Sequence, residues 1–319
     1  MQRRRALVYI GQRMVLIAFT VLAVSTIVFL GIHRLPGNAL FSEHLRGDAY
    51  LARLHYYHLD LPLIIQYRDF VTGLFLHGDL GESLVHKGVK ISPLVLRELS
   101  VSLELGAFAL IFTIGLGMLF GVVAALRHNT WVDYVLTTTA VVGYSMPNFV
   151  IATFMLLVFA VWLASVTAGS IYYTIGWSGT YGTLGQIWLP AFALGFPYAG
   201  IVARLTRASM LEVLGTDYIR TARAKGLPER IVTVRHALRN ALIPVITILG
   251  PLIVGIITGS VIIENIFGIP GLGKEFATSI LNHDYNIVIG VFTMYAAMVG
   301  LANLAVDLLY VVIDPRIRI

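Results

Sequence analysis

The 319-residue sequence contains no cysteine, and only 13% of its residues are charged. Without cysteine the chain can form neither a disulfide framework nor a thiolate metal or redox site. Soluble globular domains carry about 25% charged residues, whereas this chain combines its few charges with 57% hydrophobic residues. The scarcity of charge excludes an ordinary soluble domain and predicts an integral membrane protein.

The few charges that are present are unbalanced, with a formal net charge of +6. A basic chain can bind nucleic acid. In a membrane protein, however, Lys and Arg usually report on which side of the bilayer a segment lies. We therefore interpret the basic residues as a topology signal.

Six apolar runs approach the length of about 20 residues that crosses a bilayer. They cover about residues 14–32, 100–126, 134–165, 187–203, 241–263 and 287–313. The first follows a basic start, as in a signal peptide, but His33, Arg34 and Leu35 do not form a small-residue cleavage site. The predicted fold is an all-α polytopic membrane protein with about six transmembrane helices, the first of them retained.

Basic residues predict the orientation of these helices, because short cytoplasmic segments are enriched in Lys and Arg. With the N-terminus inside, the cytoplasmic side holds most of the 23 basic residues. They are Arg3, Arg4, Arg5, Arg13, Arg127, eight residues between Arg204 and Arg239, Arg316 and Arg318. An even number of helices also places the basic C-terminus inside, so both termini are expected in the cytoplasm.

Two polar segments interrupt the hydrophobic background. Residues 33–99 carry mixed charges and six of the nine histidines, and residues 204–240 carry eight basic residues against Glu212, Asp217 and Glu229. We divide the chain into 1–99, a transmembrane helix with an external segment, and 100–319, a transmembrane core that contains the cytoplasmic segment 204–240.

The cytoplasmic segment has the start and stop signals of a short helix. Asp217 can cap a helix that continues to Ala224, and Gly226 with Pro228 can end it. A second helix is expected to begin near Pro228 or Glu229. Such an element can dock into a groove on a partner protein, although a basic loop that touches anionic headgroups has the same composition.

The order of residues in this segment resembles the cytoplasmic EAA loop of ABC importer permeases. ArgThrAlaArgAlaLysGly (220–226) matches the part of that loop in which small residues precede a Gly, and HisAlaLeu (236–238) falls where the family has IleXaaLeu. Other similar segments are HisArgLeuProGlyAsn (33–38), HisGlyAspLeuGlyGluSer (77–83), GlyTyrSerMetProAsnPhe (143–149), AsnIlePheGlyIleProGlyLeuGly (265–273) and residues 306–318.

Departures from the general pattern narrow the resemblance. Arg220 stands where the family has Glu, and Arg239 where it has Pro. Both look like the dipeptide, oligopeptide and nickel branch, and the sequence is most similar to the dipeptide type. Asn38 and Ala39 differ from the AspPro often found after that ProGly, and the loop near 166–186 is short, which affects external docking details only.

The resemblance implies a type I importer permease in a bacterial or archaeal plasma membrane, with dipeptides or short oligopeptides as substrates. It implies four kinds of partner: a second permease subunit, two cytoplasmic ATPases, an extracytoplasmic solute-binding protein and the lipid bilayer, with no nucleic acid. ATP and magnesium would bind the ATPases, and this chain would bind no cofactor. The residues implied to couple to the ATPases are Arg220, Thr221, Ala222, Arg223, Ala224, Lys225 and Gly226.

The chain is not expected to hydrolyse ATP itself. Residues 268–274 have the spacing of a phosphate-binding loop, but Glu275 replaces the hydroxyl that would hold magnesium. The segment also lies outside in the predicted topology. The chain is therefore expected to be a non-catalytic subunit.

Polar and helix-bending residues inside the spans are candidates for the pathway or its gate. They are Glu104, Tyr144, Pro147, Asn148 and Pro251. Ordinary helix packing and interface solvation are the competing interpretations. Asp307 is more simply expected to reach the interface or to pair with a cytoplasmic Arg.

Two pairs of glycines indicate helix packing, and one cluster of histidines raises the question of a metal site. Gly117 with Gly121 and Gly255 with Gly259 are spaced for close helix packing. His55, His58 and Asp60 could ligate nickel or zinc, but solvated surface histidines are commoner, so no metal site is predicted.

Alternative functions within the same architecture are nickel or glutathione import. An ion-coupled secondary transporter is the alternative from another class, and it would predict inverted repeats and ionisable residues near the bilayer midplane. Neither is evident in the sequence.

Overall fold

The structure is a computed structural model that describes residues 2–34, 47–170, 173–178 and 182–313, with side chains from Val8 to Leu308. The basic residues Arg3 to Arg5, Arg316 and Arg318 and most of the segment 33–38 lie outside this description, wholly or in their side chains. In the described residues all assigned secondary-structure elements are helices. The one β-type contact there is a single bridge between Glu82 and Lys90. The predicted all-α class is confirmed.

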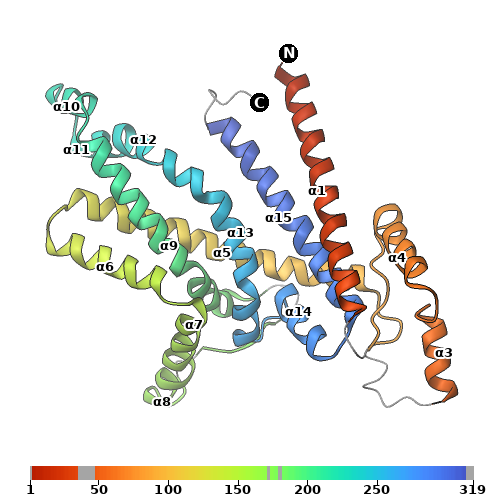
Figure 1. Cartoon of the computed structure of the whole chain (residues 1–319). Helices are drawn as coiled ribbons and strands as arrows, with labels where there is room; N and C mark the ends of the chain where they lie inside the picture. The colour runs from red at the N-terminus through yellow and green to blue at the C-terminus, as the bar shows by residue number, and fades with distance from the viewer. Residues whose placement is uncertain (1, 35–46, 171–172, 179–181, 314–319) are drawn as a thin grey trace. The chain divides into compact units, whose positions relative to one another are not determined.

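Six helices in the described part of the chain are long and apolar enough to cross a membrane. They lie in α1 (Gln2–Ile32), α5 (Ile91–Leu126), α7 to α8 (Asn148–Val166), α9 (Leu184–Leu214), α13 (Ile243–Phe267) and α15 (Tyr285–Ile313) (Figure 1). Each corresponds to one predicted run. The predicted count is confirmed, and α5 and α9 extend beyond their apolar cores.

Shorter helices connect these spans. They are α3 (Asp48–Tyr56), α4 (Leu63–Thr72) with the π-helical turn η1 (Gly73–His77), α6 (Trp131–Ser145), α10 (Asp217–Ala224), α11 (Glu229–Ile231), the π-helical η3 (Val232–Leu238), α12 (Arg239–Ala241) and α14 (Leu272–Leu281). A further π-helical stretch, η2 (Leu157–Trp162), lies between α7 (Asn148–Leu156) and α8 (Leu163–Val166).

The helices form two compact units. We call Met1–Ser102 with Pro270–Ile319 the terminal unit, and Leu103–Ile269 the central unit. In the terminal unit α1 packs along α15, and Phe29 and Ile32 of α1 meet Val288 and Ile289 of α15 in a buried cluster. Within a bilayer, van der Waals packing of such side chains favours this pairing.

The central unit is built around α9, which packs against α6, α7 and α13. The start of α9 is fixed by a capping box, in which Thr183 and Gln186 satisfy each other's backbone N–H groups. Small residues allow close approach: a Cβ on Gly117 would lie 2.6 Å from Val202 Cβ, and one on Gly121 would lie 2.5 Å from Thr206 Cβ. The predicted packing role of these two glycines is confirmed.

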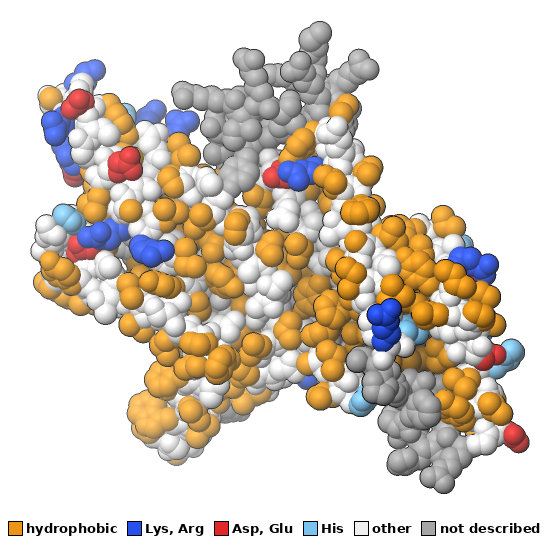
Figure 2. All heavy atoms as spheres, viewed as in Figure 1, with side chains coloured by type: hydrophobic (Ala, Val, Ile, Leu, Met, Phe, Trp, Pro, Cys, Tyr) orange, Lys and Arg blue, Asp and Glu red, His pale blue; other side chains and the backbone are white. Residues whose placement is uncertain are grey.

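The second glycine pair also lies in a packed interface. A Cβ on Gly255 would lie 2.8 Å from the Tyr198 hydroxyl of α9, and one on Gly259 would lie 3.4 Å from Asn148 Nδ2 of α7. The span formed by α7 and α8 is mostly exposed, since only 11% of it is buried inside the chain. Figure 2 shows hydrophobic side chains covering it, and Phe154 and Trp162 are more than half exposed.

Candidate functional site

The predicted helix–turn–helix in 217–229 is present. Helix α10 spans Asp217–Ala224, Gly226 follows it with φ +74°, and α11 begins at Glu229 after Pro228. The left-handed backbone of Gly226 is one that residues with a Cβ rarely adopt. One detail of the prediction is wrong: Thr216, not Asp217, occupies the N-cap position, and its side chain makes no capping bond. Asp217 lies in the first turn, where its charge favours the helix dipole.

Helix α10 has a buried face and an exposed face. Ile219 and Ala222 are buried in a cluster with Ala125, Met210 and Val232, which we call the loop core; Ala237 and Ala241 complete it. Burial of Ile219 alone is worth about 1.5–3 kcal/mol. The loop core therefore fixes the short helix to the ends of α5 and α9 and to the returning segment η3.

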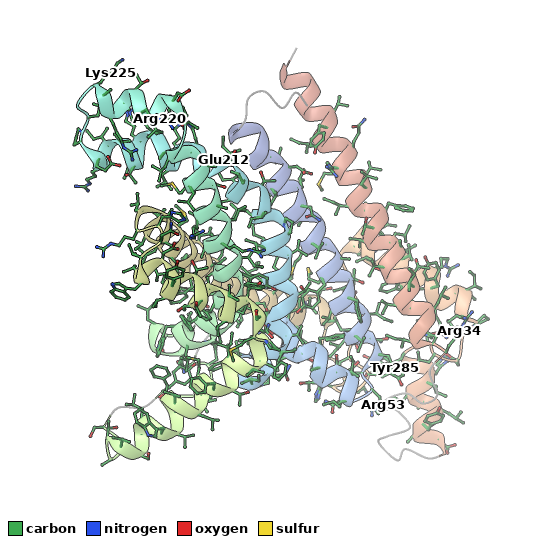
Figure 3. The ribbon with its side chains drawn as sticks, turned by 60° about the vertical axis from the view of Figure 1, so that its left-hand side comes forward. Arg34, Arg53, Glu212, Arg220, Lys225 and Tyr285 are labelled. Atoms are coloured by element: carbon green, nitrogen blue, oxygen red, sulfur yellow. The ribbon has the colours of Figure 1, made fainter. Side chains whose placement is uncertain are left out.

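The other residues implied to couple to ATPases are exposed, namely Arg220, Thr221, Arg223, Ala224, Lys225 and Gly226. Figure 3 shows Arg220 and Lys225 on the helix and on the turn that follows it. Ala222 differs because only 7% of it is exposed, so it holds the helix in place from the inside. The segment presents a basic outer surface on an apolar base.

Ion pairs shape this outer surface. Arg223 Nη2 donates to Glu229 Oε1 at 2.7 Å across the turn, and this contact holds the pKa of the Glu229 carboxyl below its ordinary value. Arg220 Nη1 lies 3.6 Å from Asp217 Oδ1 within the helix. Asn240 Nδ2 donates to the Tyr218 hydroxyl at 2.8 Å and joins α10 to α12. These contacts link α10 to the turn that follows it and to α12.

The candidate gate residues Tyr144, Pro147 and Asn148 lie at a break between two helices. Helix α6 ends at Ser145, Met146 is extended, and α7 begins at Asn148 after Pro147. Asn148 Nδ2 donates to the Gly259 carbonyl of α13 at 3.4 Å. The break confirms that the third apolar run is bent at this proline. A role for these residues as a gate stays a prediction.

Tyr144 and Arg204 form a cation–π contact one turn before the break. The Arg204 guanidinium carbon lies 5.2 Å from the centre of the Tyr144 ring. The contact joins α6 to α9, and both side chains are exposed. Sequence reasoning placed Arg204 in a polar segment, whereas the structure places it inside α9.

Glu104 and Pro251 lie on other helices of the central unit. Glu104 is half-buried on α5, and its Oε2 atom has no hydrogen-bond partner among the described residues. Pro251 is exposed on α13, which continues through it to Phe267. The structure does not bring Glu104 or Pro251 together with Tyr144, Pro147 and Asn148 through any hydrogen bond or ion pair described for them.

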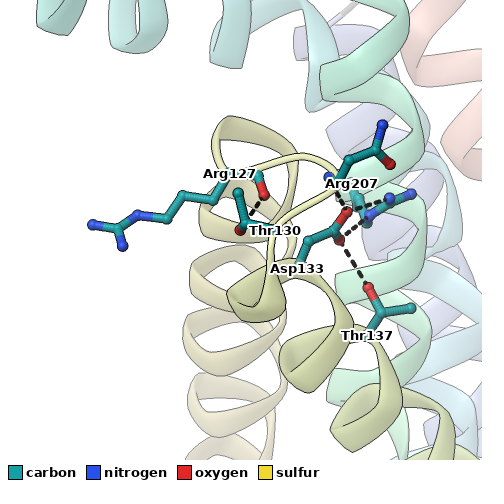
Figure 4. A network of polar contacts seen from close by, with 6 residues as sticks. Arg127, Thr130, Asp133, Thr137 and Arg207 are labelled. Carbon is teal, nitrogen blue, oxygen red and sulfur yellow. Dashed lines mark hydrogen bonds and ion pairs between the residues drawn. The ribbon is translucent and has the colours of Figure 1, made fainter.

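Sequence reasoning missed an ion pair between Asp133 and Arg207. Arg207 Nε donates to Asp133 Oδ1 at 2.7 Å, and Arg207 Nη2 donates to Asp133 Oδ2 at 2.7 Å (Figure 4). Asp133 also accepts the backbone N–H of Asn129 at 3.0 Å and the Thr137 hydroxyl at 3.2 Å. The available signal was an acidic residue in the first turn of an apolar helix, but its partner is 74 residues away.

In the terminal unit, Asp307 forms an ion pair with an Arg, which is one of the two outcomes expected for it. Arg13 Nη2 of α1 lies 2.8 Å from Asp307 Oδ2 of α15. Farther along the same pair of helices, Ser25 and Thr293 share a buried hydrogen bond of 3.0 Å. Polar contacts therefore fix the register of two otherwise apolar spans.

The segment before α5 is attached to the start of α15 by the buried residue Asp284. Its carboxylate accepts the Ser83 hydroxyl and the backbone N–H groups of Leu84 at 3.1 Å and Val85 at 3.2 Å. The Asn286 side chain donates to the Glu82 carbonyl at 3.0 Å. The segment 77–83, singled out for its resemblance, thus ends in a structural junction.

The histidine cluster near α3 does not assemble three ligands. His55 Nδ1 lies 2.9 Å from Asp60 Oδ2, and the His55 side chain is 83% exposed. His58 has φ +57° and lines a different pocket together with His33 and Gln66. Among the described residues, no group of three His, Cys, Asp or Glu side chains could hold a metal ion. The phosphate-loop spacing at 268–274 follows the helix α13 and runs into the first turn of α14, so the strand that a phosphate-binding loop requires before it is replaced by a helix.

Comparison with known proteins gives the family. Residues 117–319 match the model described as binding-protein-dependent transport system inner membrane component. The chain is 41% identical over 300 residues to the oligopeptide transport system permease protein OppB of Salmonella typhimurium, covering 94% of this chain and 95% of the relative. It is 40% identical over 312 residues to the dipeptide transport system permease protein DppB of Bacillus subtilis, covering 98% of each chain.

A solved structure supports the fold. The crystal structure of an amino acid ABC transporter with histidines matches with a TM-score of 0.50 and 17% identity, over 68% of this chain and 93% of the other. At that identity the likeness concerns the fold alone. The family match and the relatives show that the chain belongs to the family of binding-protein-dependent transport system inner membrane components, the membrane-embedded permeases of ABC importers.

Proposed function

We propose that this permease carries dipeptides or short oligopeptides, and that it forms half of a translocation pathway together with a second, homologous permease. The similarity to OppB and DppB proteins over nearly the whole chain supports this substrate class. Two cytoplasmic ATPases hydrolyse ATP with magnesium, and an extracytoplasmic binding protein delivers the peptide. The chain contributes the path and contributes no catalytic group.

The observation that carries the coupling role is the construction of α10. Its buried residues Ile219 and Ala222 anchor it on the loop core, and its exposed face offers Arg220, Arg223 and Lys225. A short helix that is rigidly based and exposed on one side suits docking into a groove of a partner. ATP-driven closure of the ATPases would then shift the permease between inward-open and outward-open states.

The proposed orientation places both termini and α10 in the cytoplasm. It rests on the concentration of basic residues in and around the segment 204–240. Because the chain has no cysteine, single substitutions Lys225→Cys and Lys87→Cys can be labelled without background. A membrane-impermeant maleimide added to intact cells is expected to modify the cysteine at 87 and to spare the one at 225; the reverse result would invert the topology.

The coupling role is tested by co-purification and ATPase assay of the tagged chain. Gly226→Asp is expected to lose the ATPases, or to lose the response of ATP hydrolysis to binding protein and peptide, because φ is +74° at this position. Gly88→Asp is the matched control, since Gly88 has φ +79° and open space around its Cβ position but lies in the proposed external segment.

Two results would contradict the proposal. Wild-type chain that purifies alone, and that transports in liposomes with an ion gradient and without ATP, would be a secondary transporter. If Gly226→Asp and Gly88→Asp bind the ATPases equally well and show the same stimulated ATP hydrolysis, α10 does not contact the ATPases.

A further inference from the structure

Asp133 and Arg207 form the most extensively bonded ion pair described in the central unit. The two guanidinium–carboxylate contacts of 2.7 Å are parallel, which is the strongest and most directional form of this interaction. Asp133 is 2% exposed and Arg207 27% exposed. Loss of one partner from such a site leaves a buried charge, which is far more costly than loss of an exposed pair.

The pair lies where three helices are in close contact. On α5, a Cβ at Gly121 would lie 2.6 Å from the Ala203 carbonyl of α9. On α9, a Cβ at Gly200 would lie 2.3 Å from the Ala140 carbonyl of α6. These short approaches place the three backbones side by side, and we call α5, α6 and α9 the helix block. A small cavity beside Arg207, lined by Ala140 and Ala203, shows that packing alone does not lock the helices together here.

One end of this block carries α10. Met210 lies three residues after Arg207 on α9 and is fully buried in the loop core against Ile219 and Ala222. Ala125 of α5 belongs to the same cluster. A displacement of α10 would therefore act directly on the ends of α5 and α9.

The other end of the block leads to the α6–α7 break. Asp133 lies in the first turn of α6, and the helix ends twelve residues later at Ser145, followed by Pro147. Asn148 then contacts Gly259 of α13. Because α6 is a continuous helix, a shift of its first turn displaces the break.

We propose that Asp133 and Arg207 are positioning residues for coupling: the ion pair makes α6 follow α9, so that a movement of α10 displaces the α6–α7 break. Neither residue touches peptide or nucleotide in this role. The inference rests on the proposed function of α10, and it assigns to the pair a mechanical part in transport beyond the stability of the fold. The physical basis is that a bidentate ion pair is directional and resists sliding of α6 along α9. Apolar contacts alone oppose such sliding weakly.

The test uses the complete transporter in proteoliposomes and measures peptide uptake per ATP hydrolysed. Arg207→Gln is expected to retain the ATPases and stimulated ATP hydrolysis, and to lower uptake per ATP by about tenfold, equivalent to a coupling loss of about 1.4 kcal/mol. Arg207→Lys keeps the charge but not the paired geometry, and is expected to fall between wild type and Arg207→Gln.

Arg127→Gln is the matched control. Arg127 lies in the same turn as Asn129. Its side chain points away from the pair in Figure 4, and it is exposed. Uptake per ATP is expected to be unchanged in this variant. An unchanged ratio in both Arg207 variants would overturn the inference. If Arg207→Gln does not assemble, the ratio measured for Arg207→Lys decides.

A distance measurement separates coupling from folding. Spin labels at Phe154→Cys on α7 and Ile262→Cys on α13, both exposed positions, report movement at the break when a non-hydrolysable ATP analogue is added. We expect a nucleotide-dependent shift in wild type and in Arg127→Gln, and no shift in Arg207→Gln despite an unchanged starting distance. A full shift in Arg207→Gln would overturn the inference, whereas failure of wild type to bind ATPases would instead overturn the proposed function.

Discussion

Arg13 Nη2 lies 2.8 Å from Asp307 Oδ2, and this ion pair joins the first and last membrane-spanning helices. Both side chains are partly exposed, at 39% and 25%, so the pair is expected to be modest in strength. Arg13→Gln and Asp307→Asn should each lower the free energy of unfolding by about 0.5–1 kcal/mol. Thermal unfolding in detergent measures both, and the double variant should lose less than the sum. Additive losses would show that the two charges do not interact.

Close contact between α5 and α9 predicts that Gly121 cannot be enlarged. Its Cβ would lie 2.5 Å from Thr206 Cβ and 2.6 Å from the Ala203 carbonyl. Gly121→Ala should destabilise the protein by about 1–3 kcal/mol because the helices must separate. Gly115→Ala is the control on the same helix, since nothing lies within 4 Å of its Cβ position. Equal thermal unfolding of the two variants would contradict this packing.

The buried carboxylate of Asp284 predicts a large loss in Asp284→Asn. Only 1% of Asp284 is exposed, and an amide would turn an N–H group toward the donors of Ser83, Leu84 and Val85. We expect a loss of about 2–3 kcal/mol, measured by thermal unfolding in detergent, and a faster protease cut in the segment before α5. Asp48→Asn, an exposed change on α3, should do neither. A stable Asp284→Asn protein would argue against the junction.

Burial raises the pKa of Glu275 on α14, with the nearby Asp284 charge acting in the same direction. A carboxyl group whose pKa is raised by folding favours the protonated form, so its stabilising effect is present at low pH and is lost as the pH rises through the folded pKa. Glu275→Gln should therefore raise the unfolding temperature at pH 8 and leave it nearly unchanged at pH 4.5. The opposite dependence would mean that the charged form is the stabilised one.

Much of the fold could be predicted because the bilayer requires long apolar helices, and those are visible in the sequence. The sequence predicted six runs, and the part of the chain that the structure describes contains six helices long and apolar enough to cross a membrane. The boundaries were less accurate where helices leave the lipid. Helix α9 extends from Leu184 to Leu214 and includes Arg204 and Arg207. Its end was predicted too early because hydropathy indicates where a helix leaves the apolar region and not where the helix ends.

The local part of the candidate site was also predictable. Gly226 and Pro228 ended α10 and started α11 as expected, since these residues restrict φ and remove a donor whatever surrounds them. The N-cap was misplaced by one residue because Thr216 and Asp217 are both common cap residues.

The sequence by itself determined that the chain is a membrane protein, that it is helical, that the helix breaks near Pro147 and that the chain turns at Gly226. Each of these depends on local composition or on the backbone preference of a single residue. Only the tertiary structure decided that Ala222 is buried, that Asp133 forms an ion pair with Arg207, and that Asp284 accepts a hydrogen bond from Ser83. Those relationships join residues far apart in the chain, and their energies depend on burial and on distances of about 3 Å, which a linear pattern does not contain.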